Sequence, residues 1–168
     1  MGRQAPRSLR AVDVTIRAYR QTDAVDLAEV MWRSVREVAV TDYTREQVEA
    51  WLPERLSPDT MHMWASSGRE VLVATDSGGR VVGYTDLESD GHIDHLYCAP
   101  EAVGEGVAAA LCDALEALAA SEGVRRLQVE ASEAARRLFE RRGFRVDSRR
   151  EWELRGVLIH NYVMSKAL

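Results

Sequence analysis

The stretch from Ile93 to Ser132 constrains the fold most, because a strand, a turn, a helix and a second strand follow one another without a long loop. The β-prone run "IDHLYC" leads into the turn "APEAVGEG", an alanine-rich helix from Gly104 to Ala120 and the strand "RRLQVEAS". Such a succession forms a parallel crossover around the helix. The turn then lies where a strand end meets a helix N-terminus, a common position for ligand sites.

The rest of the chain predicts elements on both sides of this crossover. A strand from Val12 to Tyr19 precedes three helical segments, which are opened by Thr22 and Asp23, by "TREQVEAWL" and by "SPDTMHMWASSG". The period then changes to two in "EVLVATD", "VVGYTDLE" and "HIDHLYC", which predict an antiparallel meander.

After the crossover come a helix from Glu133 to Arg142 and two strands, "FRVDSRREWEL" and "VLIHNYVMSK", joined at Arg155 and Gly156. This order predicts an α+β fold, with a mixed central sheet of about seven strands and helices on both faces.

Composition limits the classes of function. The chain has 168 residues, is 46% hydrophobic and shows no break in composition, so we expect one domain over residues 12–168. The residues before it contain Arg, Gln, Pro and Ser, and they predict a flexible tail over residues 1–11. A net charge of −5 argues against a nucleic-acid partner.

No apolar run reaches the roughly 18 residues of a membrane span, and no signal-peptide core opens the chain, which favours a cytoplasmic protein without a membrane partner. Cys98 and Cys112 have no metal-type spacing, so no metal cofactor is expected.

The turn "APEAVGEG" has the features of an anion site. Glycines such as Gly104 and Gly106 let a phosphate approach the free N–H groups of a helix N-terminus. The string "GEGVAA" also matches a dinucleotide fingerprint, and Glu130 ends the following strand. However, Ala99 to Val103 separate the first glycine from the strand, and too few elements follow for a doubly wound sheet. A third reading is that the glycines only shape the loop and the helix packing.

The run from Leu96 to Phe144 resembles the acetyl-CoA signature of the GNAT superfamily of N-acetyltransferases. It is most similar to small bacterial acetyltransferases with "GHID.LYV.P", "VEAS" and "FFERRGF" motifs, which stand here as "GHIDHLYCAP", "VEAS" and "LFERRGF". The resemblance implies the GNAT fold and acetyl-CoA as cosubstrate. The family's pyrophosphate turn, Gln/Arg-x-x-Gly-x-Gly/Ala, would begin at Glu101 and end at Gly106. Glu101 and Glu105 are departures, each expected to weaken diphosphate binding by about 0.7 kcal/mol per charge pair.

The resemblance also implies which residues bind the cosubstrate. Ser132 stands where the family has an asparagine near the pantetheine arm, and it is also a helix cap in this sequence. Arg136 or Arg137 would meet a phosphate. Phe139 replaces the family's general-acid tyrosine. The full implied set is Leu96, Tyr97, Cys98, Val103, Gly104, Glu105, Gly106, Val107, Ala108, Ser132, Arg136 and Phe139.

The candidate catalytic residues His92, Asp94 and Tyr97 lie on the strand around "HIDHLYC", and a fourth, Tyr162, lies on the last strand. His92 is either a general base or a turn-end histidine without a role, and Asp94 would orient it or take the proton through water. Strand alternation places His92 and Asp94 on one face and His95 on the other. Tyr97 and Tyr162 are substitutes for the missing acid, or core aromatic residues. A relay through Cys98 is not needed for direct attack.

The predicted function is transfer of an acetyl group from acetyl-CoA to a primary amine of a small molecule. By resemblance, Trp32, Tyr43, Trp51 and Trp64 fall in the helical region that walls the acceptor pocket, and acids such as Asp42, Glu46 and Glu49 would favour a cationic or aromatic amine. The alternatives are a non-catalytic acyl-CoA-binding sensor and a protein or peptide N-acetyltransferase. The last two strands predict an exposed edge, which favours a homodimer.

Overall fold

The computed structural model describes residues 13–168, so the predicted tail over residues 1–11 lies outside the described residues. The strands are β1 (Val14–Ala18), β2 (Glu70–Asp76), β3 (Val81–Leu87), β4 (His92–Ile93), β5 (Leu96–Cys98), β6 (Arg126–Ala131), β7 (Arg145–Leu154) and β8 (Val157–Ala167). The helices are α1 (Ala24–Arg33), α2 (Arg45–Trp51), α3 (Pro58–Ala65), α4 (Val107–Ser121) and α5 (Glu133–Arg141). This order confirms the predicted α+β class. A π-helical segment, Ser34–Val38, extends α1 and was not predicted.

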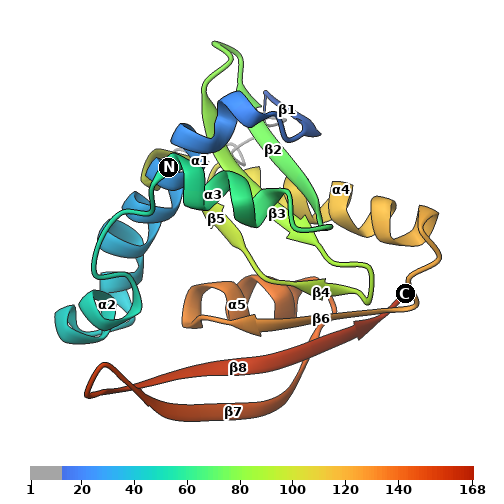
Figure 1. Cartoon of the computed structure of the whole chain (residues 1–168). Coiled ribbons are helices and arrows are strands. Elements are labelled where there is room, and N and C mark those ends of the chain that lie inside the picture. The colour runs from blue at the N-terminus through green and yellow to red at the C-terminus, as the bar shows by residue number, and fades with distance from the viewer. Residues whose placement is uncertain (1–12) are drawn as a thin grey trace, which may run out of the picture.

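The strands form two four-stranded sheets, with the orders β1-β2-β3-β5 and β4-β6-β8-β7 (Figure 1). Pairing is antiparallel except between β4 and β6, where His92 lies beside Gln128. The expected single strand "HIDHLYC" is therefore wrong in one respect, because it breaks at residues 94–95 and gives one piece to each sheet. In Figure 1 the two sheets diverge from this break toward α2.

Buried polar side chains of β3 cause the break. The fully buried Asp86 accepts hydrogen bonds at Oδ1 from the backbone N–H groups of Asp94 (3.1 Å) and His95 (2.7 Å). The Thr85 hydroxyl donates to the carbonyl oxygen of His95 (2.8 Å). Arg69 donates to the second oxygen of Asp86 (2.8 Å), so this buried carboxylate is fully partnered. These bonds replace ladder bonds, and the strand leaves the first sheet here.

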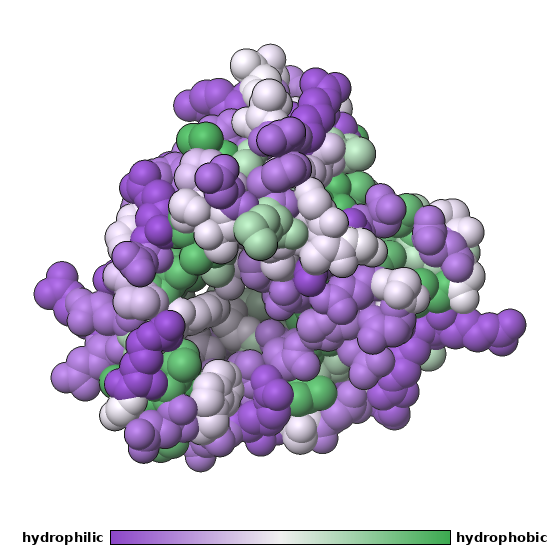
Figure 2. All heavy atoms as spheres, in the orientation of Figure 1, coloured by the Kyte–Doolittle hydropathy of each residue, from purple (hydrophilic) through white to green (hydrophobic). Residues whose placement is uncertain are grey.

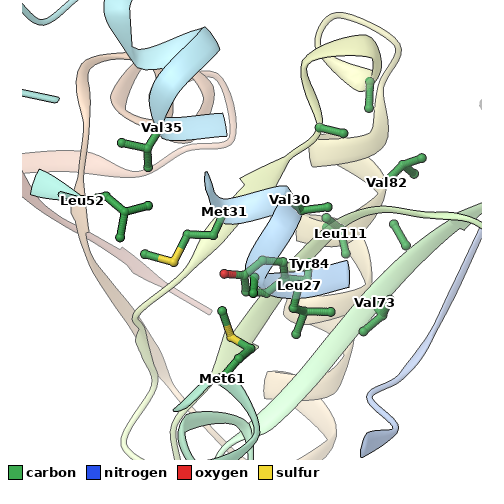
Figure 3. Packing of buried hydrophobic residues seen from close by; sticks show 14 of the residues in the cluster. Leu27, Val30, Met31, Val35, Leu52, Met61, Val73, Val82, Tyr84 and Leu111 are labelled. Carbon is green, nitrogen blue, oxygen red and sulfur yellow. The ribbon is translucent and has the colours of Figure 1, made fainter. Parts of the chain in front are cut away.

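Helices cover both faces of the first sheet. Figure 3 shows Leu27 of α1 and Met61 of α3 next to Tyr84 of β3, and all three side chains are fully buried. The preceding residue of β3, Gly83, faces α4, where a β-carbon would lie 3.2 Å from Leu111 Cδ1. Burying each large apolar side chain contributes about 1.5–3 kcal/mol, so this layer holds α1, α3 and α4 in place.

A second core lies between α4, α5 and the second sheet. Phe139 of α5 packs on Phe144, with ring centroids 4.7 Å apart. The cap of α5 is Ser132, whose Oγ accepts from the N–H of Ala135 (3.3 Å). The predicted cap role of Ser132 is confirmed. Within residues 13–168, no helix has both the length and the apolar character to cross a membrane.

Candidate functional site

A groove of about 420 Å³ lies between β5, the N-terminal end of α4, α5 and the π-helical segment. Of the residues implied by resemblance, eight line it: Leu96, Tyr97, Cys98, Val103, Gly104, Gly106, Ala108 and Ser132. The others lie outside the lining. Glu105 is exposed on the turn, while Val107 and Phe139 are buried in the two cores.

The arginine that lines the groove is Arg141, and not Arg136. Arg136 donates to Glu140 (3.1 Å) and Glu133 (3.3 Å) on its own helix and lies over the ring of Tyr162. Arg137, the other predicted phosphate ligand, donates to Asp42 (2.7 Å). Both guanidinium groups therefore already have carboxylate partners.

The glycine turn presents backbone to the groove. Gly104 and Gly106 have φ angles of 79° and 85°, in the left-handed region where a side chain is strained. Gly106 is the N-cap of α4, so the first N–H groups of the helix have no acceptor within the helix. These groups and the positive end of the helix dipole fit a phosphate group.

Glu101, the acidic departure in this turn, is neutralised from a distant helix. Arg33 at the end of α1 donates to both carboxylate oxygens of Glu101, at 3.1 and 2.9 Å. The hydrogen bonds from Arg33 hold the pKa of Glu101 below its usual value. The paired charge reduces the repulsion of a diphosphate that Glu101 alone would cause.

A second cavity, also of about 420 Å³, adjoins the groove. It is lined mainly by polar groups of the β4–β5 break and of β6, β7 and β8, including Asp94, His95, Glu130, Arg150, Asn161 and His160. The two cavities share the lining residues Tyr43, Trp51, Tyr97 and Ser132, so they meet at one junction. Figure 2 shows a hollow on the face between α2 and the region of β4 and β5, with hydrophilic residues around it.

His92 lies behind Glu130 and not in the lining of either cavity. Its Nε2 is 2.5 Å from Glu130 Oε2, and its Nδ1 is 3.7 Å from Glu88. Burial lowers the pKa of His92, but the hydrogen bond and charge of Glu130, with those of Glu88 and Asp94, outweigh it and raise the pKa. The register of the parallel pair β4 and β6 creates this contact, and the order of elements predicts the parallel direction but not this register.

The expected alternation of His92, Asp94 and His95 is wrong, because the break interrupts the strand. Asp94 and His95 both line the second cavity. Asp94 Oδ2 accepts from Trp64 Nε1 (2.9 Å) and from Arg69 (3.0 Å). Burial raises the pKa of Asp94, but these donors and the nearby charges lower it overall, which makes it a weak base.

The side chain of His95 is 13% exposed, and its ring is uncharged at neutral pH. It stacks on Trp64 with ring centroids 4.1 Å apart, and burial lowers its pKa to about 4. Its ring therefore forms a neutral wall of the second cavity.

Comparisons with known proteins agree with this architecture. The family model of the acetyltransferase (GNAT) domain matches residues 39–166. The chain belongs to the GNAT acetyltransferase family. YafP of Escherichia coli K12, named an uncharacterized N-acetyltransferase, is 32% identical over 90% of this chain and 95% of its own length.

Solved structures show the same fold for this acetyltransferase. A GCN5-related N-acetyltransferase from Rhodopseudomonas palustris has a TM-score of 0.84 and 34% identity, over 94% of this chain and 97% of that one. A phosphinothricin acetyltransferase from Sinorhizobium meliloti, solved with acetyl-CoA, has a TM-score of 0.76 and 21% identity, over 94% and 89% of the two chains.

The two candidate acid tyrosines of the acetyltransferase lie in different places. Tyr97 lines both cavities, and burial together with the charge of Asp94 raises its pKa above the usual value, so its hydroxyl stays protonated at neutral pH. The Tyr162 hydroxyl donates to Glu133 Oε1 (2.7 Å) and lies outside the lining of either cavity.

The thiol of Cys98 lies at the groove but is poorly nucleophilic. Burial raises its pKa to about 12, so the reactive thiolate is scarce at neutral pH. Of the predicted acceptor wall, Tyr43 and Trp51 lie at the junction, while Trp32 packs against Arg36 and Trp64 lies behind Asp94.

Proposed function

We propose that this acetyltransferase moves the acetyl group of acetyl-CoA to the primary amine of a small molecule, by direct attack of the amine on the thioester. The observation that carries the proposal is the junction at Tyr97, where a backbone-lined groove meets a pocket with carboxylates. Bound acetyl-CoA would supply the acyl group and a thiolate leaving group. The outcome is one new N–C bond and one broken C–S bond.

The groove residues fit acetyl-CoA. The turn at Gly104 and Gly106 suits the pyrophosphate, and apolar residues such as Leu96 and Val103 suit the pantetheine arm. The N–H of Ala99 donates to Val82 on β3 (2.9 Å). Ladder bonds alternate along an antiparallel strand, so the N–H groups of Leu96 and Cys98 face the groove and can polarise a carbonyl there.

Proton movements are assigned to Tyr97 at the junction and to Glu130 of the second cavity, with His92 behind it. Glu130 takes the proton of the substrate ammonium, and His92 behind it shares that proton across their 2.5 Å contact. Tyr97 gives a proton to the departing thiolate. Asp94 is a positioning residue, since its carboxylate is held by Trp64 and Arg69.

The first test is titration calorimetry of acetyl-CoA into the purified protein, followed by thiol release with a panel of small primary amines. Binding with amine-dependent release is the expected result. Binding without release from any amine would favour an acyl-CoA sensor, and release only with peptides would favour a peptide acetyltransferase. Either outcome overturns the small-molecule proposal.

We also propose that two chains pair through β7. This strand has β8 as its one neighbour in the sheet, and its side chains are exposed along nearly its whole length. A monomer mass by light scattering at micromolar concentration would contradict it. The cytoplasmic location stays a prediction from the sequence.

A further inference from the structure

We infer that the acceptor carries an oxyanion, such as a carboxylate, beside its primary amine, and that Arg150 binds this group. The inference rests on the proposed function, because it concerns the pocket that would receive the amine. It names the substrate class as amino acids and similar zwitterions.

Two contacts orient the side chain of Arg150 on β7. It lies opposite Asn161 of β8, and its Nε donates to Asn161 Oδ1 (3.0 Å). Its guanidinium carbon lies 5.4 Å from the ring centroid of Trp152, which also lines the pocket. These contacts use Nε and one face of the group. The two terminal nitrogens remain as a fork that matches the two oxygens of a carboxylate.

The other charged groups of the pocket already have partners. Asp94 lies 3.0 Å from Arg69, Glu130 lies 2.5 Å from His92, and His160 lies 2.8 Å from Glu133. Within residues 13–168, by contrast, no carboxylate lies within 4.0 Å of the Arg150 guanidinium. Nearby arginines of β7 differ, since Arg145 pairs with Asp147 (3.3 Å) and Arg149 pairs with Glu151 (3.0 Å).

Charge complementarity then selects the acceptor. One wall of the pocket presents Glu130, whose Oε2 contacts His92 and whose Oε1 is left for an ammonium group, and another presents the unpaired cation of Arg150. A zwitterionic amine satisfies both walls. An amine without an anionic group leaves Arg150 unpaired, and a diamine places a second cation beside it.

The experiment compares matched acceptors by acetyl-CoA-dependent thiol release. The panel holds the proteinogenic amino acids, and for each substrate found it adds the carboxamide and the amine that lacks the carboxyl group. We expect kcat/KM for the free acid to exceed that for the carboxamide by about 10- to 100-fold.

Variants of Arg150 test whether this residue causes the preference for the free acid over the carboxamide. Arg150→Gln should raise KM for the acid by about 10- to 100-fold, with little change for the carboxamide. Arg150→Glu should reverse the preference toward amines that carry a second cation. Arg145→Gln is the matched control on the same strand, because Arg145 lies outside the lining of either cavity, and the preference should persist in it. Acetyl-CoA binding by calorimetry reports that each variant is folded.

The outcomes separate the two proposals. Equal kcat/KM for acids and carboxamides, or an unchanged preference in Arg150→Gln, would overturn the inference and leave the acetyltransferase function standing. Binding of acetyl-CoA without thiol release from any compound would overturn the proposed function, and the inference would fall with it.

Discussion

Tyr97 is the residue on which the proposed chemistry of the junction depends most directly. It lines both cavities, and burial raises its pKa, so the hydroxyl is a proton donor at neutral pH. Replacing Tyr97 by Phe keeps the ring and removes the donor. We expect kcat to fall by about 10- to 100-fold while the Kd for acetyl-CoA stays nearly unchanged, as steady-state kinetics and calorimetry would show.

A second tyrosine provides the control for this change. The Tyr19 hydroxyl pairs with His62 Nδ1 (3.0 Å), outside the lining of either cavity. Tyr19→Phe should leave kcat unchanged. An equal loss of kcat in both variants would contradict the role of Tyr97.

The pair of His92 and Glu130 predicts the pH dependence. The pKa of His92 is raised, so the pair must first lose a proton before it can accept one from the substrate, and kcat/KM should rise with pH through a value above 6.5. His92→Gln should remove this limb of the pH profile and lower kcat/KM by about 10-fold or more. His62→Gln, at a residue that lines neither cavity, is the control. A limb that is unchanged in His92→Gln would exclude the histidine from the proton path.

The raised pKa of His92 also predicts how the stability of the fold changes with pH. A histidine whose folded pKa is raised stabilises the fold fully below its unfolded pKa of about 6.5. That contribution is lost as the pH rises through the raised folded pKa. Stability and activity should therefore change in opposite directions over this window.

At the scale of elements, the end of α1 and the glycine turn act together. Arg33→Gln would leave Glu101 uncompensated at the turn, and we expect acetyl-CoA to bind about 3- to 10-fold more weakly by calorimetry. Adding Glu101→Gln to the Arg33→Gln variant should restore its affinity for acetyl-CoA. Arg45→Gln, at a position whose side chain is 90% exposed, is the matched control. Unchanged affinity in Arg33→Gln would show that the pair has no part in binding.

The sequence predicted the order of these elements because period, caps and turns are local signals. Thr44 and Gln47 form the expected capping box, and the last two strands turn at Arg155 and Gly156. The break after β4 could not be predicted in this way, since it depends on Asp86 binding backbone eight and nine residues away. The predicted alternation of side chains between the two faces of the strand is therefore wrong for His95.

Site residues that depend on long-range packing were missed for the same reason. Arg33 meets Glu101 across 68 residues, and Glu130 meets His92 only through the register of β4 and β6. The signal for Glu130 was present in part, because "VEAS" ends the strand that follows the crossover. The register of that parallel pair was needed to place Glu130 beside His92.

At the scale of the whole molecule, the groove lies between elements of both sheets. Its walls come from β5 and α4 on one side and from α5 on the other. A ligand that binds there favours the folded state, and acetyl-CoA at 100 times its Kd should add about 2.7 kcal/mol to the free energy of unfolding. For a chain of this size we expect a rise in Tm of about 5–10 °C by calorimetric scanning.

The control is the Arg33→Gln variant, in which the same rise should need more acetyl-CoA. A Tm that does not change at saturating acetyl-CoA would contradict binding in this groove.

The groove proposed for acetyl-CoA and the cavity proposed for the acceptor are built by different elements, which has an evolutionary consequence. The residues proposed to hold the acyl donor lie on β5, α4 and α5, whereas Arg150, Trp152 and Leu154 lie on the outermost strand, β7 (Figure 1). The side chains of β7 are exposed along nearly its whole length, so changes among them disturb few contacts within the chain. New acceptors can therefore be acquired by drift in β7 while the donor half is retained, and a library that randomises these three positions is the natural starting point for redesign.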